Sequence, residues 1–174
     1  MASQGDFEAV ALPHMADLFR TASRMLGDRA RADDVVQETY LQAWKSFHRF
    51  ELGTNCRAWL FRILFNCILH HRRKWLRASA GDGALEFAQA PPGPLPESLS
   101  DKEIIAALDK VPPEYRSAVL LCDVEEFAYK EVAAILEIPI GTVMSRVSRG
   151  RKLLRDHLAS AAASLGIGRA RTNL

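Results

Sequence analysis

The residues best suited to bind another molecule lie between Ile138 and Arg155, a stretch with five basic residues and no acidic one. Arginine presents paired donors that match guanine or phosphate, and serine and threonine add short hydroxyl donors. If a helix starts near Thr142 and turns by about 100° per residue, the polar side chains gather on one face. The chemistry of that face is recognition of a polyanion, and its candidate members are Thr142, Ser145, Arg146, Arg149 and Lys152.

Apolar residues on the other side of the same helix indicate how it is held in place. They are Val143, Val147, Gly150 and Leu154, and a short preceding helix over 129–136 offers Val132, Ala133 and Leu136 against them. Ile138 fills the corner, and Pro139 with Gly141 shapes the turn. The pattern predicts a helix-turn-helix whose last helix enters the major groove of DNA. Met144, at the edge of the polar face, either touches a thymine methyl group or packs against its neighbours.

A second basic segment lies in the front half of the chain, where residues 52–81 contain no Asp or Glu. A helix that begins near Arg57 would bury an apolar stripe and turn a polar face outward, and that face carries Arg62, Asn66, His70 and Arg73. Asn66 stands among apolar residues, so it is either a structural amide satisfied inside the fold or an exposed contact to DNA. The run of bases after it favours contact. The loop over 48–57 has polar and aromatic side chains that could hold an unstacked base of single-stranded DNA.

Both halves of the 174-residue chain show helical periodicity, without a convincing run of alternating strand residues. Gly27 is expected to end the first long helix, and Pro113 to occupy the first turn of a later one. The segment 78–98, with four Pro and three Gly, breaks every periodicity. We therefore predict an all-α protein with two small helical domains, at 8–77 and 99–160, a flexible linker at 78–98 and a C-terminal tail at 161–174.

Composition and motif content argue against several other classes of protein. No apolar run reaches the roughly 20 residues of a membrane span, so we expect a cytoplasmic protein without membrane insertion. The three cysteines form no C-x-x-C pair and the histidines are scattered, so we expect reduced thiols, no metal site and no cofactor. Neither a nucleophile with its base nor a phosphate-binding glycine loop is found, so no catalytic residues and no enzymatic activity are predicted.

Three segments together carry a family resemblance: "RADDVVQETYLQAW", "GTNCRAWLFRILFNCILHHRRK" and "PPEYRSAVLLCDVEEFAYKEVAAILEIPIGTVMSRVSRGRKLL". In this order, around a variable linker, they resemble bacterial RNA polymerase sigma factors of the extracytoplasmic-function group, group 4 of the sigma-70 family. The resemblance covers about residues 8–160. It implies a sigma-2-like front domain, a sigma-4-like helix-turn-helix domain, and an alternative sigma factor that directs promoter-specific transcription initiation.

The resemblance also implies partners and contact residues. The helix with "ADDVVQETYLQAW" would dock on the beta-prime clamp helices of core RNA polymerase, through Asp34, Gln37, Glu38, Leu41 and Trp44. The loop over 48–57 would capture a flipped non-template base of the melted minus-ten element, with Arg62, Asn66, His70, Arg73 and Lys74 on nearby DNA. The last helix would read the minus-35 element as duplex. The polymerase beta flap, promoter DNA and a cognate anti-sigma protein are the further expected partners.

Two other functions stay open on the residues alone. A free-standing helix-turn-helix regulator would sense a ligand with its front half and bind a palindromic duplex as a dimer, without polymerase. The basic, Asn-bearing front helix argues against it. An interaction protein that sequesters a helical partner would bind that partner independently of salt and would have no affinity for promoter DNA.

Overall fold

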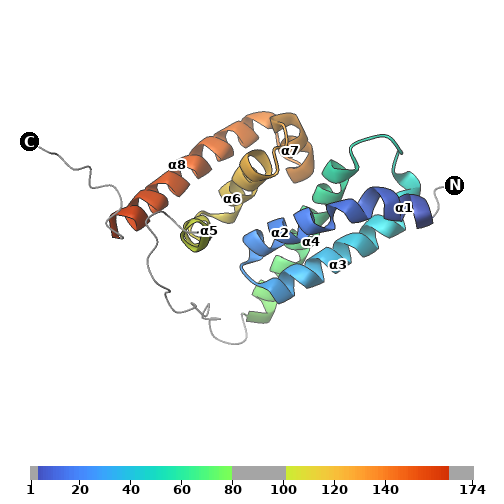
Figure 1. Ribbon diagram of the computed structural model, residues 1–174, viewed down its shortest axis with the longest axis horizontal. Helices are drawn as coiled ribbons and strands as arrows, with labels where there is room; N and C mark the ends of the chain where they lie inside the picture. Colours follow the sequence, from blue (N-terminus) through green and yellow to red (C-terminus); the bar gives the residue numbers. More distant parts are fainter. Residues whose placement is uncertain (1–3, 80–100, 165–174) are drawn as a thin grey trace, which may run out of the picture.

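The computed structural model describes residues 4–79 and 101–164, and every regular element in these ranges is helical (Figure 1). The front half contains α1 (Gln4–Ala11), α2 (Met15–Leu26), α3 (Arg29–Ser46) and α4 (Cys56–Ser79), with 3₁₀ turns at Leu12–His14 and Phe47–Arg49. The back half contains α5 (Asp101–Asp109), α6 (Pro113–Val119), a π-helical turn at Leu120–Val124, α7 (Tyr129–Leu136) and α8 (Ile140–Ser164). The predicted all-α class is therefore confirmed.

Capping residues set the limits of the front helices. Gly27 adopts the left-handed conformation, with a φ of 65°, and ends α2 as predicted. Asp28 then caps α3, because its carboxylate accepts hydrogen bonds from the backbone N–H groups of Ala30 at 2.8 Å and Arg31 at 3.2 Å. The side-chain oxygen of Asn55 caps the start of α4 in a similar way. Gly27 thus ends α2, whereas Asp28 and Asn55 fix where α3 and α4 begin.

The helices of the front half bury apolar stripes with the spacing that the sequence predicts. The side chains that α2, α3 and α4 seal completely include Leu18, Val35, Leu60 and Leu64. Helix α1 precedes the first predicted helix and adds Phe7 to this core. The Phe7 ring meets the rings of Trp44 and Phe47 edge-on, with centroids 5.2 and 5.1 Å apart. The core thus keeps α3 and α4 side by side, with their polar faces outward.

The helix-turn-helix is present, but its turn is built differently from the prediction. Glu137, with a φ of 56°, takes the left-handed position that ends α7. Gly141 lies inside the first turn of α8 and has no positive φ, so it does not shape the turn. Pro139 contributes as predicted, since its carbonyl oxygen accepts hydrogen bonds from the N–H groups of Thr142 at 2.9 Å and Val143 at 3.1 Å.

Several helix limits differ from the predicted boundaries. Helix α8 begins at Ile140 rather than Thr142 and continues to Ser164, past the start of the predicted tail at 161. Helix α4 continues to Ser79, just inside the predicted linker, and the remainder of that linker lies outside the described residues. Pro113 does occupy the first turn of α6, as predicted.

Helices α6 and α8 approach each other closely at Gly150, which is buried in α8. A methyl group added to Gly150 would lie 2.5 Å from Cγ2 of Val119 and 3.1 Å from the carbonyl oxygen of Tyr115. Both distances are too short for an unshifted side chain, so glycine is required for this close approach. The sequence placed Gly150 on the buried face without revealing what it touches.

The two halves pack against each other through α4 and α7, and α2 also contacts α5 and α6 (Figure 1). Phe61 of α4 and Phe127, just before α7, meet edge-on with ring centroids 5.1 Å apart. Arg116 of α6 is buried, and its Nη1 donates to the carbonyl oxygens of Arg24 at 3.4 Å and Met25 at 3.3 Å, at the end of α2. A cation at a helix C-terminus is a favourable arrangement.

Candidate nucleic-acid interface

The residues predicted to contact duplex DNA lie along the outer side of α8. Three of them are exposed, namely Ser145, Arg149 and Lys152. The other two, Thr142 and Arg146, are half-buried. On the opposite side Val143 and Val147 are sealed in the core, with exposed fractions of 0% and 1%. The predicted division of α8 into a polar and a buried face is confirmed, and contact with DNA stays a prediction.

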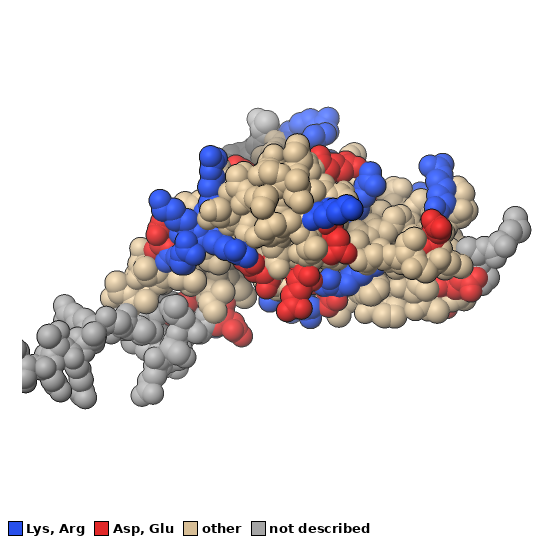
Figure 2. All heavy atoms as spheres, turned by 90° about the horizontal axis from the view of Figure 1, so that it is seen from above, with Lys and Arg blue, Asp and Glu red and all other residues tan. Residues whose placement is uncertain are grey.

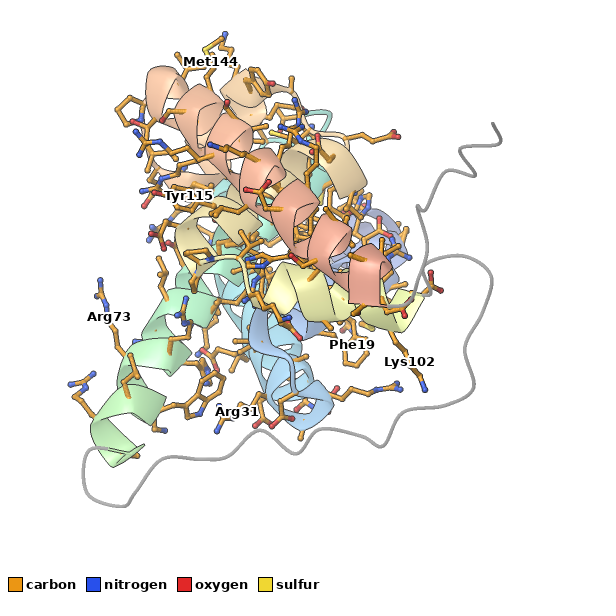
Figure 3. The ribbon with its side chains drawn as sticks, turned by 90° about the vertical axis from the view of Figure 1, so that its left-hand side faces the viewer. Phe19, Arg31, Arg73, Lys102, Tyr115 and Met144 are labelled. Carbon is orange, nitrogen blue, oxygen red and sulfur yellow. The ribbon has the colours of Figure 1, made fainter. Side chains whose placement is uncertain are left out.

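Two large apolar side chains stand on the exposed part of α8. Met144 is 53% exposed and points away from the fold near the start of α8 (Figure 3), and Ile140 is 50% exposed. The interior therefore does not take up Met144. Beside it, the hydroxyl of Ser145 donates to the carbonyl oxygen of Thr142 at 3.0 Å and keeps its lone pairs available.

Arg151 belongs to the same basic segment but has an acidic partner. Its Nε and Nη2 donate to the two carboxylate oxygens of Asp123, at 2.9 and 2.6 Å. These hydrogen bonds raise the pKa of the Arg151 guanidinium above its usual value. Seen from above, Lys and Arg gather in separate groups with Asp and Glu between them (Figure 2). The pairing with Asp123 explains why basic residues of one helix are not equally available to an anion.

The residues predicted to contact the minus-ten element are all exposed on α4: Arg62, Asn66, His70, Arg73 and Lys74. Asn66 is therefore not a buried structural amide. Arg73 projects into solvent near the end of α4 (Figure 3). Arg62 differs from the others because its Nη2 donates to Oε1 of Glu137, in the back half, at 2.6 Å.

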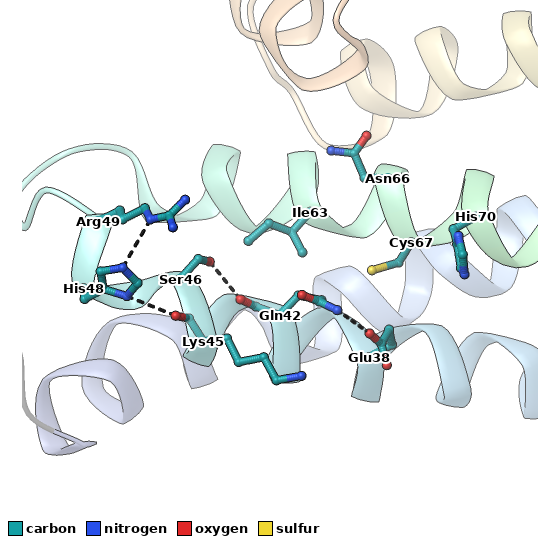
Figure 4. Close-up of a pocket in the computed structure, with 10 residues that line it drawn as sticks. All are labelled: Glu38, Gln42, Lys45, Ser46, His48, Arg49, Ile63, Asn66, Cys67 and His70. Atoms are coloured by element: carbon teal, nitrogen blue, oxygen red, sulfur yellow. Dashed lines mark hydrogen bonds between the residues drawn. The ribbon is translucent and has the colours of Figure 1, made fainter.

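A cavity of about 550 Å³ opens between α3, α4 and the turn that joins them (Figure 4). Asn66 and His70 line it from α4, and His48 and Arg49 line it from the turn. Glu38 lines it from α3, so a residue predicted to contact polymerase shares the cavity with residues predicted to contact DNA. No sequence pattern had indicated this, because the walls come from three separate segments.

Aromatic rings support the loop over 48–57 from within. The Phe50 and Trp59 rings lie 4.7 Å apart, and Phe50 stacks on the buried Phe47 with an interplanar angle of 14°. These three rings pack against one another. The exposed loop side chains are mostly polar, and Leu52, which is 53% exposed, is the large apolar exception.

The predicted polymerase-contacting residues form one stripe along α3. Asp34 and Gln37 are exposed, and Glu38 is half-buried. Leu41 and Trp44 are 47% and 44% exposed, which leaves a small apolar surface beside the acidic residues. An apolar centre with a charged rim is a common composition for a protein-binding surface.

Sequence reasoning missed the role of Arg57, which it counted with the basic segment. Its guanidinium donates to Oε2 and the backbone carbonyl of Glu125 and to Asp17 Oδ2, the last at 3.3 Å. It also lies 4.4 Å from the centre of the Phe127 ring. Its partners stand 40 and 68 residues away along the chain, so no local signal could have found them.

The thiols and the titratable clusters suggest no reactive centre in the described ranges. Burial raises the pKa of Cys56 and Cys67, and burial with the nearby Asp123 carboxylate raises that of Cys122 to about 11. All three cysteines are free. Among residues 4–79 and 101–164 no three His, Cys, Asp or Glu side chains group closely enough to hold a metal ion. No helix of these ranges has the length and apolar character needed to cross a membrane.

Two protein-family models match the chain, in the order of its two halves. Sigma-70 region 2 matches residues 11–77, and Sigma-70, region 4 matches residues 101–154. The first match covers α2 to α4, and the second covers α5 to α7 with most of α8. The fold and the two matches together define the class of protein, a two-part helical chain of the sigma-70 type.

Similar proteins show to which family within this class the chain belongs. The ECF RNA polymerase sigma factor EcfG of Rhodopseudomonas palustris (strain TIE-1) is 39% identical over 135 residues, 76% of this chain and 74% of that protein. SigE of Mycolicibacterium smegmatis is 35% identical over 164 residues, which is 91% of this chain but 63% of that longer relative. The chain belongs to the extracytoplasmic-function family of RNA polymerase sigma factors.

A solved structure agrees with this family. The sigma factor RpoE in complex with the anti-sigma factor NepR, from Bartonella quintana, superimposes with a TM-score of 0.78 at 32% sequence identity. The match covers 88% of this chain and 97% of that chain. The similarity therefore extends over both halves rather than over the helix-turn-helix alone.

Proposed function

We propose that the protein is an alternative sigma factor that binds core RNA polymerase and directs it to a two-part promoter. The observation that carries this proposal is the pair of exposed cationic faces, one on α4 and one on α8, in a chain of the sigma-factor family. Residues 8–77 would dock on polymerase and bind the minus-ten element. Residues 99–160, extended by the end of α8, would bind the minus-35 element. The segment 78–98 would tether them, so that binding of one raises the effective concentration of the other.

Helix α8 would read the minus-35 element in the major groove. Arg146 and Arg149 supply donors for guanine edges or phosphates. Thr142 lies in the first turn of α8, where the helix dipole favours a phosphate, and Ser145 adds a hydroxyl in the next turn. Lys152, further along, would contact the backbone. The exposed Met144 would lie against the methyl group of a thymine, the apolar group that the major groove offers.

Helix α4 and the loop over 48–57 would hold the minus-ten element as parted strands. The cavity beside the loop offers a place for an unstacked base, with amide and imidazole groups on its wall. The basic end of α4 would follow the phosphates past that base. The proposed contacts are Arg62, Asn66, His70, Arg73 and Lys74.

The stripe on α3 would dock on the beta-prime clamp helices, with Leu41 and Trp44 at its centre and Asp34, Gln37 and Glu38 around them. The back half would contact the beta flap. The polymerase would supply all the catalysis, and the complex would work in the cytoplasm, where it meets chromosomal DNA. A cognate anti-sigma protein is proposed as regulator, by analogy with the Bartonella quintana sigma factor that was crystallised with NepR.

In vitro run-off transcription tests the proposal. Bacterial core polymerase would be combined with the full chain on a pool of genomic fragments from the source organism, and start sites would be mapped. We expect starts that require the chain and share two elements upstream. A pool without chain-dependent starts would contradict the proposal. Binding to a palindromic duplex by a dimer, without polymerase, would favour a free-standing regulator instead.

A further inference from the structure

Two apolar side chains stand one helical turn apart on the exposed part of α8. Met144 is 53% exposed and Ile140 is 50% exposed, and Met144 projects away from the fold (Figure 3). Residues four positions apart in a helix lie on the same side of it, with their Cβ atoms about 5–6 Å apart. Ile138, two residues earlier, packs against the core instead. The fold therefore buries one isoleucine of this segment and leaves Ile140 and Met144 as an exposed pair, which we call the apolar strip.

Small and polar residues border the apolar strip. Gly141, Ser145 and Ser148 are exposed on the same helix, and the space around Gly141 is open. A stable protein–protein interface buries about 800 Å² on each partner, far more than two side chains offer. The strip is therefore suited to a small apolar group on a ligand that is otherwise polar.

The apolar strip lies in the part of α8 that would enter the major groove. The groove of B-DNA is about 12 Å wide and a helix with its side chains is about 10–12 Å across, so a helix that enters the groove nearly fills it. Every exposed side of the first two turns then faces DNA, not only the side that carries the arginines. Ile140 and Met144 belong to these two turns, together with Ser145.

The next basic residue on the side of the strip is Arg151, seven positions after Met144, and it is already paired. Its guanidinium donates to both carboxylate oxygens of Asp123, at 2.9 and 2.6 Å. A phosphate gains little from a cation whose charge is already compensated, so the strip would face base edges rather than the DNA backbone. The apolar group that base edges present in the major groove is the C5-methyl group of thymine.

We propose that the apolar strip recognises the C5-methyl groups of two neighbouring pyrimidines in the minus-35 element. Met144 would contact one methyl group and Ile140 the next. This inference rests on the proposed function, and it specifies the chemical group that this part of α8 reads. 5-Methylcytosine carries its methyl group on the same ring atom as thymine, so the strip should accept it as well. Methylation of cytosine at such a position would then strengthen the promoter.

Templates that differ only in methyl groups test the inference. Core polymerase with the full chain would transcribe a promoter found by run-off mapping, in which the thymines of the minus-35 element are replaced one at a time by uracil. Uracil lacks the methyl group and keeps every hydrogen-bonding group. At each position that responds, a second pair of templates would carry cytosine or 5-methylcytosine opposite guanine. Transcript yield would be measured at limiting polymerase.

Loss of one methyl group should lower the apparent affinity about fourfold, the effect of burying a single methyl group against an apolar side chain. The template with 5-methylcytosine should exceed the template with cytosine by a similar factor. These changes leave base pairing intact, so they report the contact to the methyl group alone.

Substitutions assign each methyl group to a side chain. Met144→Ala should give equal yields on thymine and uracil templates at one position, and Ile140→Ala should do so at the neighbouring position. Met144→Leu keeps an apolar side chain and should retain the difference. Ile104→Ala is the matched control, because Ile104 is 42% exposed but belongs to α5, and it should behave like the parent chain. Circular dichroism would check that the variants are folded.

Equal yields of the parent chain on thymine and uracil templates at every position of the minus-35 element would overturn the inference, as would a minus-35 element that contains no thymine. A difference that persists in both Met144→Ala and Ile140→Ala would also overturn it, because another group would then contact the methyl. A response of Met144→Ala alone would reject the contact assigned to Ile140.

The outcome is separable from that of the proposed function. Specific starts with equal yields on thymine and uracil templates reject the methyl contact and leave the sigma-factor proposal standing. If no start depends on the chain, the full chain alone would select from a random duplex library prepared once with thymine and once with uracil. Enrichment that requires both the methyl groups and Met144 would support the inference without polymerase. Equal enrichment from the two libraries, or none from either, would reject it together with the proposed function.

Discussion

Replacing Gly150 by alanine should destabilise the back half, against the usual preference of helices for alanine. In a helix interior this substitution normally stabilises by about 1 kcal/mol. Here the new methyl group would lie 2.5 Å from Cγ2 of Val119, whose side chain is 3% exposed. Overpacking of a closed core costs about 1–3 kcal/mol, and the β-branched Val119 has little freedom to rotate away. The difference between this cost and the gain in helix propensity is a net loss of up to about 2 kcal/mol.

Gly141→Ala is the matched control, because Gly141 belongs to the same helix and has open space around the position of an added methyl group. We expect this variant to be more stable than the parent by about 0.5–1 kcal/mol, through reduced freedom of the unfolded chain. Val119→Ala in the Gly150→Ala background removes the clashing Cγ2. The two changes should therefore cost less together than the sum of their separate effects, by about 1 kcal/mol.

Urea denaturation followed by circular dichroism measures these differences. With an m-value of about 2 kcal/mol/M, the two glycine variants should differ in midpoint by roughly 1 M. The shifted α8 should also weaken minus-35 binding in Gly150→Ala and leave it unchanged in Gly141→Ala. Equal stabilisation by both alanines would refute the close approach of α6 and α8 at Gly150.

Three further predictions concern single side chains. Arg149→Ala should weaken binding to minus-35 duplex by about 1–3 kcal/mol in fluorescence anisotropy. Arg151→Ala should weaken it less, because the Arg151 guanidinium is already paired with Asp123. Equal losses would remove Arg149 from base reading. Glu38→Lys should weaken binding to core polymerase in a pull-down without changing the circular dichroism spectrum. Glu8→Lys, at an exposed position on α1, should leave that binding unchanged. Unchanged affinity for Glu38→Lys would reject the α3 surface as the docking site. Burial and Asp123 raise the pKa of Cys122 to about 11, and the thiolate is the form that reacts with iodoacetamide. At pH 8 the reaction of Cys122 should therefore be roughly two orders of magnitude slower in the folded chain than in urea. Equal rates would place this thiol in solvent.

The parts of the interface that the sequence predicted well are those that follow from helical periodicity. A repeat of three and four residues decides which side of α4 and α8 is apolar, and burial of that side follows in any compact fold. Exposure of Arg149 was predictable for this reason, whereas for Asn66 periodicity left burial and exposure open and the basic run after it favoured exposure. The end of α2 at Gly27 was predictable as well, because glycine takes the left-handed conformation at little cost.

The parts that failed depend on contacts from elsewhere in the chain. Glu137, not Gly141, adopts the left-handed conformation at the turn, although glycine is the residue that favours it. Glu137 also bonds to Arg62 of the front half, a contact that the local sequence of the turn does not contain. The cavity beside Asn66 was likewise invisible, since its walls come from α3, α4 and the turn between them.

Taken alone, the sequence determined the helices, their polar and apolar sides, and the family to which the chain belongs, because each of these depends on residues close together or in a recognisable order. Only the tertiary structure decided that Arg57 neutralises Glu125, that Arg62 meets Glu137, and that Gly150 touches α6. Such pairings join residues that are distant along the chain. They are settled by how whole helices dock, where shape and compensation of buried charge act together and no short pattern records the result.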